Sequence, residues 1–142
     1  MYPTSSYQDA AVGRSDFPPV FVCELRDAGV GAGWVHVAGE LDIDTAPRLE
    51  RMLRGAELRS RLVVLDLREL NFVDACGVRV IAYASLRARR GGRRLVLLRG
   101  AAQIQRLLAL SGASDLLQII DLAPGEPAVQ VLLQLAHDGQ AA

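Results

Sequence analysis

The sequence predicts an α/β domain with a mixed, mainly parallel sheet of about five strands and four helices packed on it. The chain has 142 residues, of which 51% are hydrophobic, which is enough for one compact core. Residues 62–67 (Leu-Val-Val-Leu-Asp-Leu) form a nearly continuous hydrophobic run, as expected of a central parallel strand. Helix and strand patterns alternate from there towards the C-terminus, which is typical of β-α units.

The N-terminal part of the domain is predicted to be a β-hairpin. Residues 1–17 have the composition of a flexible tail, which leaves residues 18–142 as a single domain. Residues 20–25 and 34–37 are predicted strands, and the glycine-rich stretch 27–33 between them is typical of a turn.

Four helices and two more strands are predicted besides the central strand. Asp44 or Thr45 can cap a first helix that runs to about Leu58. A second helix runs from about Ala75 to Arg90 and stops at two glycines. The remaining elements are a strand at 94–98, a helix at 101–110, a strand at 116–120 and a last helix at 127–137.

Charge, cysteine content and hydropathy argue against several classes of function. Sixteen acidic residues balance sixteen basic ones, which argues against direct binding of nucleic acid. We see neither a signal peptide nor an apolar run of about 18 residues, so we expect a cytoplasmic protein that does not span a membrane. The two cysteines lack metal-ligand spacing, so neither a metal nor another cofactor is expected. No histidine lies near Cys76 in the sequence, which argues against an enzyme.

The most informative segment is 72–80, where the chain is predicted to pass from a buried strand into the second helix. The start of a helix exposes free backbone N–H groups, which the Asp74 carboxylate can cap. Cys76 brings a nucleophilic side chain to the same point of the surface. We therefore expect the functional site at this junction.

The second helix has a face that is not expected in a core. One face gathers the small or apolar residues Gly77, Val78, Ile81, Ala84, Ser85 and Ala88, which are expected to pack on the sheet. The opposite face carries Cys76, Arg79, Val80, Tyr83, Arg87 and Arg90. Two interpretations stay open: an arginine-rich solvated face, or a protein-binding surface in which Tyr and Arg surround a small apolar centre.

Several motifs resemble the STAS domain, in the form found in bacterial anti-sigma factor antagonists. The resemblance covers about residues 20–121 and rests on Gly39-Glu40-Leu41-Asp42, Thr45-Ala46, the strand at 62–67 and Asp74-Ala75-Cys76-Gly77. The last of these is similar to the family's Asp-Ser-Ser-Gly. The resemblance implies a STAS-like domain that binds an anti-sigma factor with serine kinase activity and thereby releases a sigma factor.

The resemblance also implies a phosphorylation switch, and this chain departs from it. In the family, the anti-sigma kinase phosphorylates the serine before that glycine, which prevents binding, and a PP2C-type phosphatase resets the switch. Here Cys76 replaces that serine, Ala75 replaces the one before it, and Arg79 stands where a small residue is common. A thiol is not a normal substrate of a serine kinase. We therefore predict a member that binds partners but is not switched by phosphorylation at residue 76.

Two roles for Cys76 remain open: an inert isostere of serine, or the responsive thiol of a redox or ligand sensor on the same fold. By resemblance, the loop with Glu40 and Asp42 lies beside the switch and contributes to partner contact. From the residues alone, Asp42 is a helix cap or a solvated loop residue. The predicted partner-binding residues are Glu40, Asp42, Asp74, Ala75, Cys76, Gly77, Arg79, Val80, Tyr83 and Arg87. Of these, Cys76, Val80 and Tyr83 are expected at the centre.

Overall fold

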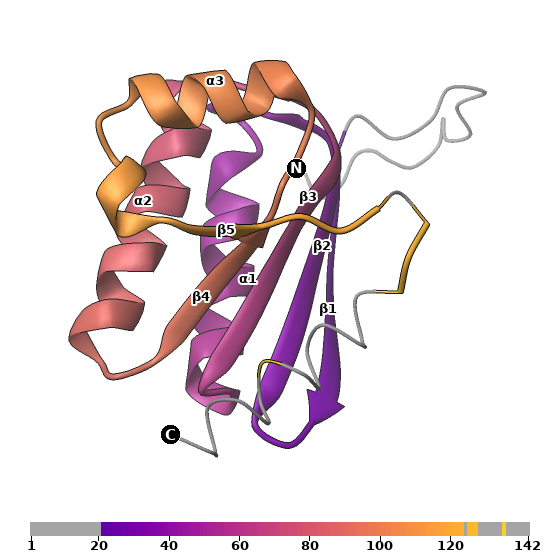
Figure 1. Ribbon diagram of the computed structural model, residues 1–142, viewed down its shortest axis with the longest axis vertical. Coiled ribbons are helices and arrows are strands. Elements are labelled where there is room, and N and C mark those ends of the chain that lie inside the picture. Colours follow the sequence, from indigo (N-terminus) through magenta and orange to yellow (C-terminus); the bar gives the residue numbers. More distant parts are fainter. Residues whose placement is uncertain (1–20, 124, 128–134, 136–142) are drawn as a thin grey trace.

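The structure is a computed structural model that describes residues 21–123, 125–127 and 135. Its five strands form one sheet in the order β1-β2-β3-β4-β5 (Figure 1). The predicted α/β class is confirmed. The predicted tail at 1–17 and almost all of the predicted helix at 127–137 lie outside the described residues.

The sheet begins with the predicted hairpin. β1 (Phe21–Gly29) and β2 (Ala32–Leu41) pair in antiparallel fashion. The turn between them consists of Val30 and Gly31, which have φ angles of +48° and +74°. A two-residue turn with both φ angles positive matches the twist of the flanking strands. Gly31 adopts this backbone readily, whereas Val30 is β-branched and 59% exposed.

The other strands join in parallel: β3 (Leu62–Val73), β4 (Arg94–Leu98) and β5 (Gln118–Ile120). β3 is longer than predicted. Its first half pairs with both neighbours, but the pairing with β4 ends at Asp66, and the rest of β3 pairs with β2 alone. The first half is buried on both faces, as the hydrophobic run predicts.

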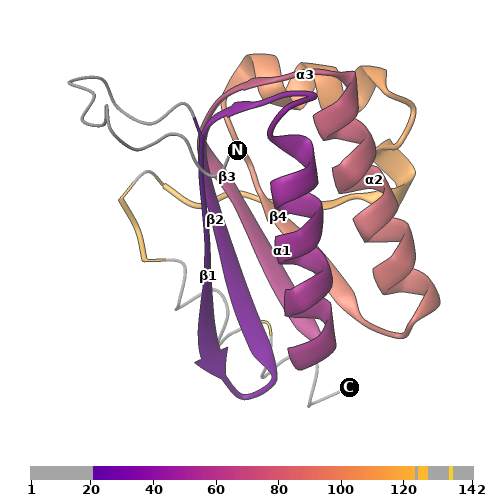
Figure 2. The ribbon, with the colours of Figure 1, turned by 180° about the vertical axis from the view of Figure 1, so that it is seen from behind.

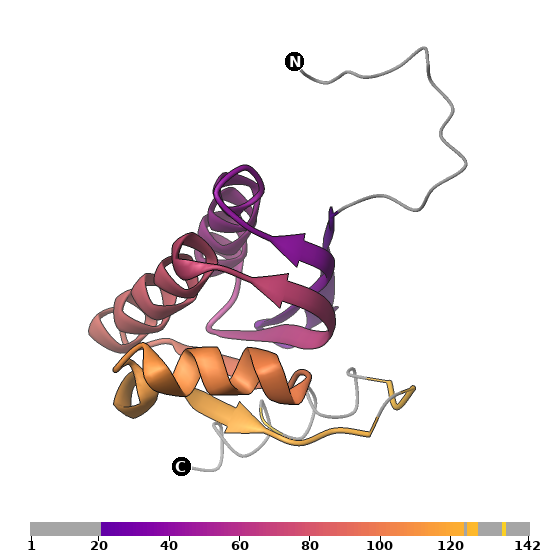
Figure 3. The same cartoon turned by 90° about the horizontal axis from the view of Figure 1, so that it is seen from above.

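Two long helices cover one face of the sheet. α1 (Ala46–Arg59) and α2 (Ala75–Arg90) lie side by side on it (Figures 2 and 3). Leu49 and Leu53 of α1 and Ile81 of α2 are fully buried in the main core, together with Val35 and Leu65 of the sheet. The amphipathic patterns of both helices are therefore used to cover this face.

A third helix, α3 (Ala102–Leu110), lies at the end of the sheet where β3 passes into α2 (Figure 1). Ile104 and Leu108 anchor it in the main core. A 3-10 turn (Ser114–Leu116) then leads into β5. The described residues thus contain three α-helices. They correspond to the first three of the four predicted helices.

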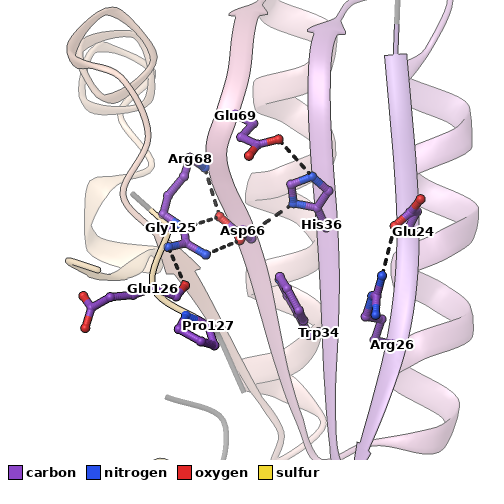
Figure 4. Close-up of a pocket in the computed structure, with 10 residues that line it drawn as sticks. All are labelled: Glu24, Arg26, Trp34, His36, Asp66, Arg68, Glu69, Gly125, Glu126 and Pro127. Carbon is purple, nitrogen blue, oxygen red and sulfur yellow. Dashed lines mark hydrogen bonds and ion pairs between the residues drawn. The ribbon is translucent and has the colours of Figure 1, made fainter. Parts of the chain in front are cut away.

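The opposite face of the sheet carries a smaller apolar cluster and a buried ion pair. The Asp66 carboxylate accepts hydrogen bonds from Nε and Nη2 of Arg68 at 2.9 and 2.8 Å (Figure 4). Nη1 of Arg68 donates to the carbonyl oxygens of Ala123 and Glu126 at 2.7 and 2.9 Å. The pair therefore fastens the segment after β5 to the sheet.

Asp66, Arg68 and Glu126 line a hollow of about 400 Å³, together with Trp34 and His36 of β2 (Figure 4). His36 lies between two carboxylates, with Nδ1 3.8 Å from Asp66 and Nε2 3.4 Å from Glu69. Burial acts to raise the pKa of Asp66, but the hydrogen bonds and charge of Arg68 prevail and hold that pKa below its usual value. Asp66 lies within β3, and its partner Arg68 is the residue that holds the segment after β5.

Candidate functional site

The start of α2 is organised by the carboxylate of Asp74. One oxygen, Oδ1, accepts hydrogen bonds from the backbone N–H groups of Cys76 and Gly77 at 2.9 and 3.1 Å. Asp74 is therefore the N-cap of α2, as the sequence predicts. The second oxygen, Oδ2, accepts a hydrogen bond from the N–H of Ile43, at 3.1 Å.

This contact joins the start of α2 to the loop at 41–45. The N–H of Asp74 also donates to the carbonyl of Leu41, at 3.1 Å. The loop with Asp42 thus lies beside the predicted switch position, as expected, whereas Glu40 belongs to the end of β2. Whether the loop contacts a partner stays a prediction.

The loop itself is held by Asp42 and Thr45. The Asp42 carboxylate accepts hydrogen bonds from the N–H groups of Asp44 and Thr45, at 3.0 and 3.1 Å. In return, the Thr45 hydroxyl accepts a hydrogen bond from the N–H of Asp42 and donates to the carbonyl of Glu40. Thr45 is the N-cap residue of α1, one of the two predicted, but its side chain makes no capping hydrogen bond to the helix. Asp42 organises the turn instead, while Glu40 is exposed.

Gly77 allows the start of α2 to approach the core closely. A Cβ atom at this position would lie 2.6 Å from Cγ of Leu41 and 2.7 Å from Cγ2 of Val73. Both neighbours are fully buried, so a larger residue would push α2 outwards. Gly77 is buried, and its role in shaping the site is indirect.

Around this cap, the predicted site residues differ in exposure. Ala75, Arg79 and Tyr83 are exposed, and Tyr83 retains 58% of its accessible surface. Cys76 is a free cysteine of intermediate exposure, and one side of it packs against the main core. Ala75, Arg79 and Tyr83 are four residues apart and so form an accessible strip along the first half of α2, with Cys76 beside its start.

The predicted position of Val80 at the centre of this surface is wrong. Val80 is 8% exposed and belongs to the main core. It follows Cys76 by one turn, but α2 packs on α1 as well as on the sheet. The buried arc of α2 is therefore wider than a single face.

Arg87 is also not the free surface residue that the helical pattern predicts. Its Nη2 and Nε donate to the two carboxylate oxygens of Glu57 on α1, at 2.7 and 3.1 Å. Both side chains are largely buried, and the hydrogen bonds to Glu57 raise the pKa of Arg87. Arg87 therefore fastens α2 to α1.

Three exposed apolar residues near the start of α2 were not predicted from the sequence. Ile43, Leu107 and Leu110 are 67%, 41% and 75% exposed. A signal for the last two exists in the sequence, because Ile104 and Leu108 already supply the core-facing positions of α3. Leu107 and Leu110 lie on another side of that helix and do not pack in the core.

The described ranges can also be compared with the requirements of a metal site and of a membrane-spanning helix. They hold no group of three or more His, Cys, Asp and Glu side chains placed to bind a metal ion. Among these same residues, no helix combines the length and the hydrophobicity that crossing a membrane requires. Cys23 packs against the main core, and burial raises the pKa of its thiol to about 11.

Comparison with solved structures places the fold. An anti-sigma factor antagonist from Mycobacterium paratuberculosis superposes with a TM-score of 0.67 at 20% identity, over 83% of this chain and 95% of that one. The antagonist SpoIIAA superposes in its unphosphorylated form with a TM-score of 0.64, and the Bacillus protein in its phosphorylated form with 0.62. Both are 17% identical and cover 78% of this chain and 96% or 99% of theirs.

Sequence comparison gives the family. No curated protein matches the chain. The family model described as STAS domain matches residues 28–137, which is most of the chain. This match agrees with the order of strands and helices and with the capped start of α2. The chain belongs to the STAS domain family.

Proposed function

We propose that this protein is an anti-sigma factor antagonist that is not switched by phosphorylation at residue 76. It binds an anti-sigma factor with serine kinase activity through the start of α2 and so releases a sigma factor. It acts in the cytoplasm, carries out no catalysis and does not contact nucleic acid. The observation that carries the proposal is the hydrogen-bonded junction at Asp74, with the exposed Ala75 and Arg79 beside Cys76.

The geometry of the cap supports a surface built for recognition. Asp74 holds both the first turn of α2 and the loop at Ile43, so this surface is already ordered before a partner binds. Little conformational entropy is then lost on binding. The likeness to solved anti-sigma factor antagonists supports the same class of function. An interface of about 800 Å² on each partner is enough for micromolar to nanomolar binding.

The chemistry of residue 76 supports the loss of the switch. A serine kinase transfers phosphate to a hydroxyl oxygen, and Cys76 offers sulfur instead. The thiol is similar in shape to a serine hydroxyl, so the surface stays in its unphosphorylated form. A phosphate would add about −1.5 to −2 charges next to the Asp74 carboxylate. Such a charge would weaken binding, and this chain avoids it.

The test uses the serine kinase-type anti-sigma factors of the same organism. Each is titrated with the unaltered chain, with Cys76→Ser and with Cys76→Asp, in calorimetry. We expect the Ser variant to bind as tightly as the unaltered chain and the Asp variant to bind about tenfold or more weakly. No binding by any anti-sigma factor contradicts the proposed partner class.

A second arm tests the switch alone. Each form is incubated with the bound kinase and ATP and then weighed by mass spectrometry. We expect one phosphate on Cys76→Ser and none on the unaltered chain. If the unaltered chain carries stoichiometric phosphate on residue 76, the loss of the switch is wrong. If the Ser variant is phosphorylated, a PP2C-type phosphatase can be tested on it.

A further inference from the structure

The end of the sheet opposite the candidate site is rich in arginine. The connections from α1 to β3 and from α2 to β4 lie side by side there, and the N–H of Arg94 donates to the carbonyl of Arg61 at 2.8 Å (Figure 1). Five arginines of this end, which we call the basic end, form no ion pair with a described residue: Arg59, Arg61, Arg90, Arg93 and Arg94. They come from the last turns of α1 and α2 and from the residues that lead into β3 and β4.

Few carboxylates oppose the arginines of the basic end. Glu57, in the last turn of α1, is already paired with Arg87. Among the described residues, Asp27 and Asp115 are the other acidic residues near this end: Asp27 lines a small pocket with Arg59, and the carbonyl of Asp115 accepts from Arg89. The carboxylates of the candidate site lie at the opposite end of the sheet. The chain has no net charge, but the basic end is positive and attracts anions.

The same end exposes two large apolar side chains. Val30, at the tip of the β1–β2 turn, is 59% exposed, and Leu58, in the last turn of α1, is 85% exposed. The turn adjoins the arginines, because the carbonyl of Gly31 accepts a hydrogen bond from the N–H of Arg61 at 2.8 Å. Apolar side chains that enter the headgroup region and cations that attract anionic lipids both contribute to peripheral membrane binding.

We infer that the basic end, together with Val30 and Leu58, binds peripherally to a membrane surface that contains anionic lipids. The arginines contact lipid phosphates, and the two apolar side chains enter between the headgroups. A nucleic acid also offers phosphates, but its backbone provides no apolar region for Val30 and Leu58.

This orientation leaves the candidate site accessible. α2 has 16 residues and is therefore about 24 Å long, and it runs from the candidate site to the basic end. A domain bound by its basic end presents the start of α2 on the side away from the lipid. The inference goes beyond the proposed function and does not depend on it.

The first test is co-sedimentation of the full chain with lipid vesicles. One set of vesicles consists of phosphatidylcholine alone, and the other contains about 30% phosphatidylglycerol, which makes its surface negative. We expect the chain to bind the anionic vesicles about tenfold or more tightly, and high salt to remove this preference by screening the charges. Equal binding to both sets, or binding to neither, overturns the inference.

A pair of matched double variants locates the contact. Arg61→Glu/Arg90→Glu reverses two exposed arginines of the basic end, whereas Arg51→Glu/Arg106→Glu reverses two exposed arginines in the first half of α1 and on α3. The two proteins have the same net charge, and circular dichroism checks that both are folded. We expect the first variant to bind anionic vesicles about tenfold or more weakly and the second to keep most of the affinity. Equal weakening of both overturns the assignment to the basic end.

A pair of single variants tests the apolar contact. Leu58→Gln and Leu110→Gln each remove an exposed leucine, and Leu110 lies on α3, away from the basic end. Both side chains are exposed, so neither change is expected to affect folding. We expect Leu58→Gln to weaken binding to anionic vesicles about threefold or more and Leu110→Gln to leave it unchanged. An unchanged affinity of Leu58→Gln overturns the assignment of a lipid surface.

Two soluble polyanions serve as competing ligands. Duplex DNA represents a nucleic acid, and polyglutamate represents an acidic protein surface. We expect both to bind more weakly than the anionic vesicles, because neither offers an apolar region to Leu58. Tighter binding to either of them overturns the inference and identifies the other class of ligand.

Discussion

The carboxylate of Asp74 accepts a hydrogen bond from the N–H of Ile43, although the two residues are 31 positions apart. The other oxygen of the same carboxylate caps α2. One side chain therefore fixes two chain segments that leave neighbouring parallel strands. The ends of parallel strands meet at one edge of the sheet, where such contacts position the functional sites of many α/β folds.

Removal of this carboxylate should both destabilise the domain and increase the mobility of the loop at 41–45. We expect Asp74→Ala to lower the free energy of unfolding by about 1–2 kcal/mol, because three backbone N–H groups lose their acceptor. Urea unfolding measures the loss. Hydrogen exchange should show faster exchange of the Ile43 amide, since its bond to Asp74 is removed.

Asp44→Ala is the matched control for this prediction. Asp44 is an exposed carboxylate in the same loop, and its side chain accepts no hydrogen bond from any described residue. We expect a change within about 0.5 kcal/mol. Equal effects of the two substitutions would show that Asp74 does not organise the junction.

The hairpin turn offers a stabilising substitution. Val30 has a φ of +48°, which is unfavourable for a β-branched residue by roughly 1–2 kcal/mol. Val30→Asn gives the Asn-Gly pair that this turn favours, so we expect a gain of about 1 kcal/mol in urea unfolding. Val30→Thr is equally polar at the surface but still β-branched, and it should give little gain. A similar gain from both variants would refute the role of backbone strain.

The two cysteines should differ in reactivity. Burial raises the pKa of Cys23 to about 11, so at pH 8 only about one thiol in a thousand is ionised. Cys76 lies at the accessible start of α2. Titration with a thiol reagent should give one fast and one slow phase, and Cys76→Ser should remove the fast phase.

The rate of the fast phase also separates the two roles of Cys76. A rate at or below that of a free cysteine peptide is expected for an inert isostere of serine. A rate well above it favours the redox or ligand sensor. Loss of the slow phase in Cys76→Ser would contradict the assignment of the two thiols.

The order of elements could be predicted because its signals are local. The hairpin turn and the run at 62–67 each depend on a few neighbouring residues. The full length of β3 could not be predicted in this way. Beyond Asp66 the strand pairs with β2 alone, with two register shifts. The buried residues Leu67, Leu70 and Val73 are three positions apart, so this part lacks the two-residue alternation by which a strand is predicted.

Only part of the candidate surface could be predicted from the sequence, because α2 has α1 on one side and α3 on another. Val80 and Arg87 are two turns apart on α2 and therefore lie on the same side, which faces α1. Arg79 and Tyr83 lie towards α3 and line a groove between the two helices, together with Leu107 and Leu110. The helical pattern grouped all four, since it contains no information about which helix packs on which side.

The buried pair of Asp66 and Arg68 makes stability depend on pH. The native pKa of Asp66 lies below that of the unfolded chain, which is about 3.9. The carboxylate therefore contributes stability fully above that value, and this contribution is lost as the pH falls through the native pKa. We expect Asp66→Asn to cost about 3 kcal/mol at pH 7, because it leaves Arg68 without its counter-charge.

Urea unfolding of both forms between pH 3 and pH 7 tests this prediction. The gap between the unaltered chain and Asp66→Asn should be widest at neutral pH and should narrow below about pH 4, where Asp66 of the unfolded chain takes up a proton while the native carboxylate still resists protonation. Asp44→Asn removes an exposed carboxylate and should show a small, nearly constant gap. A gap for Asp66→Asn that stays constant down to pH 3 would mean that its charge contributes nothing and that only the shape of the side chain matters.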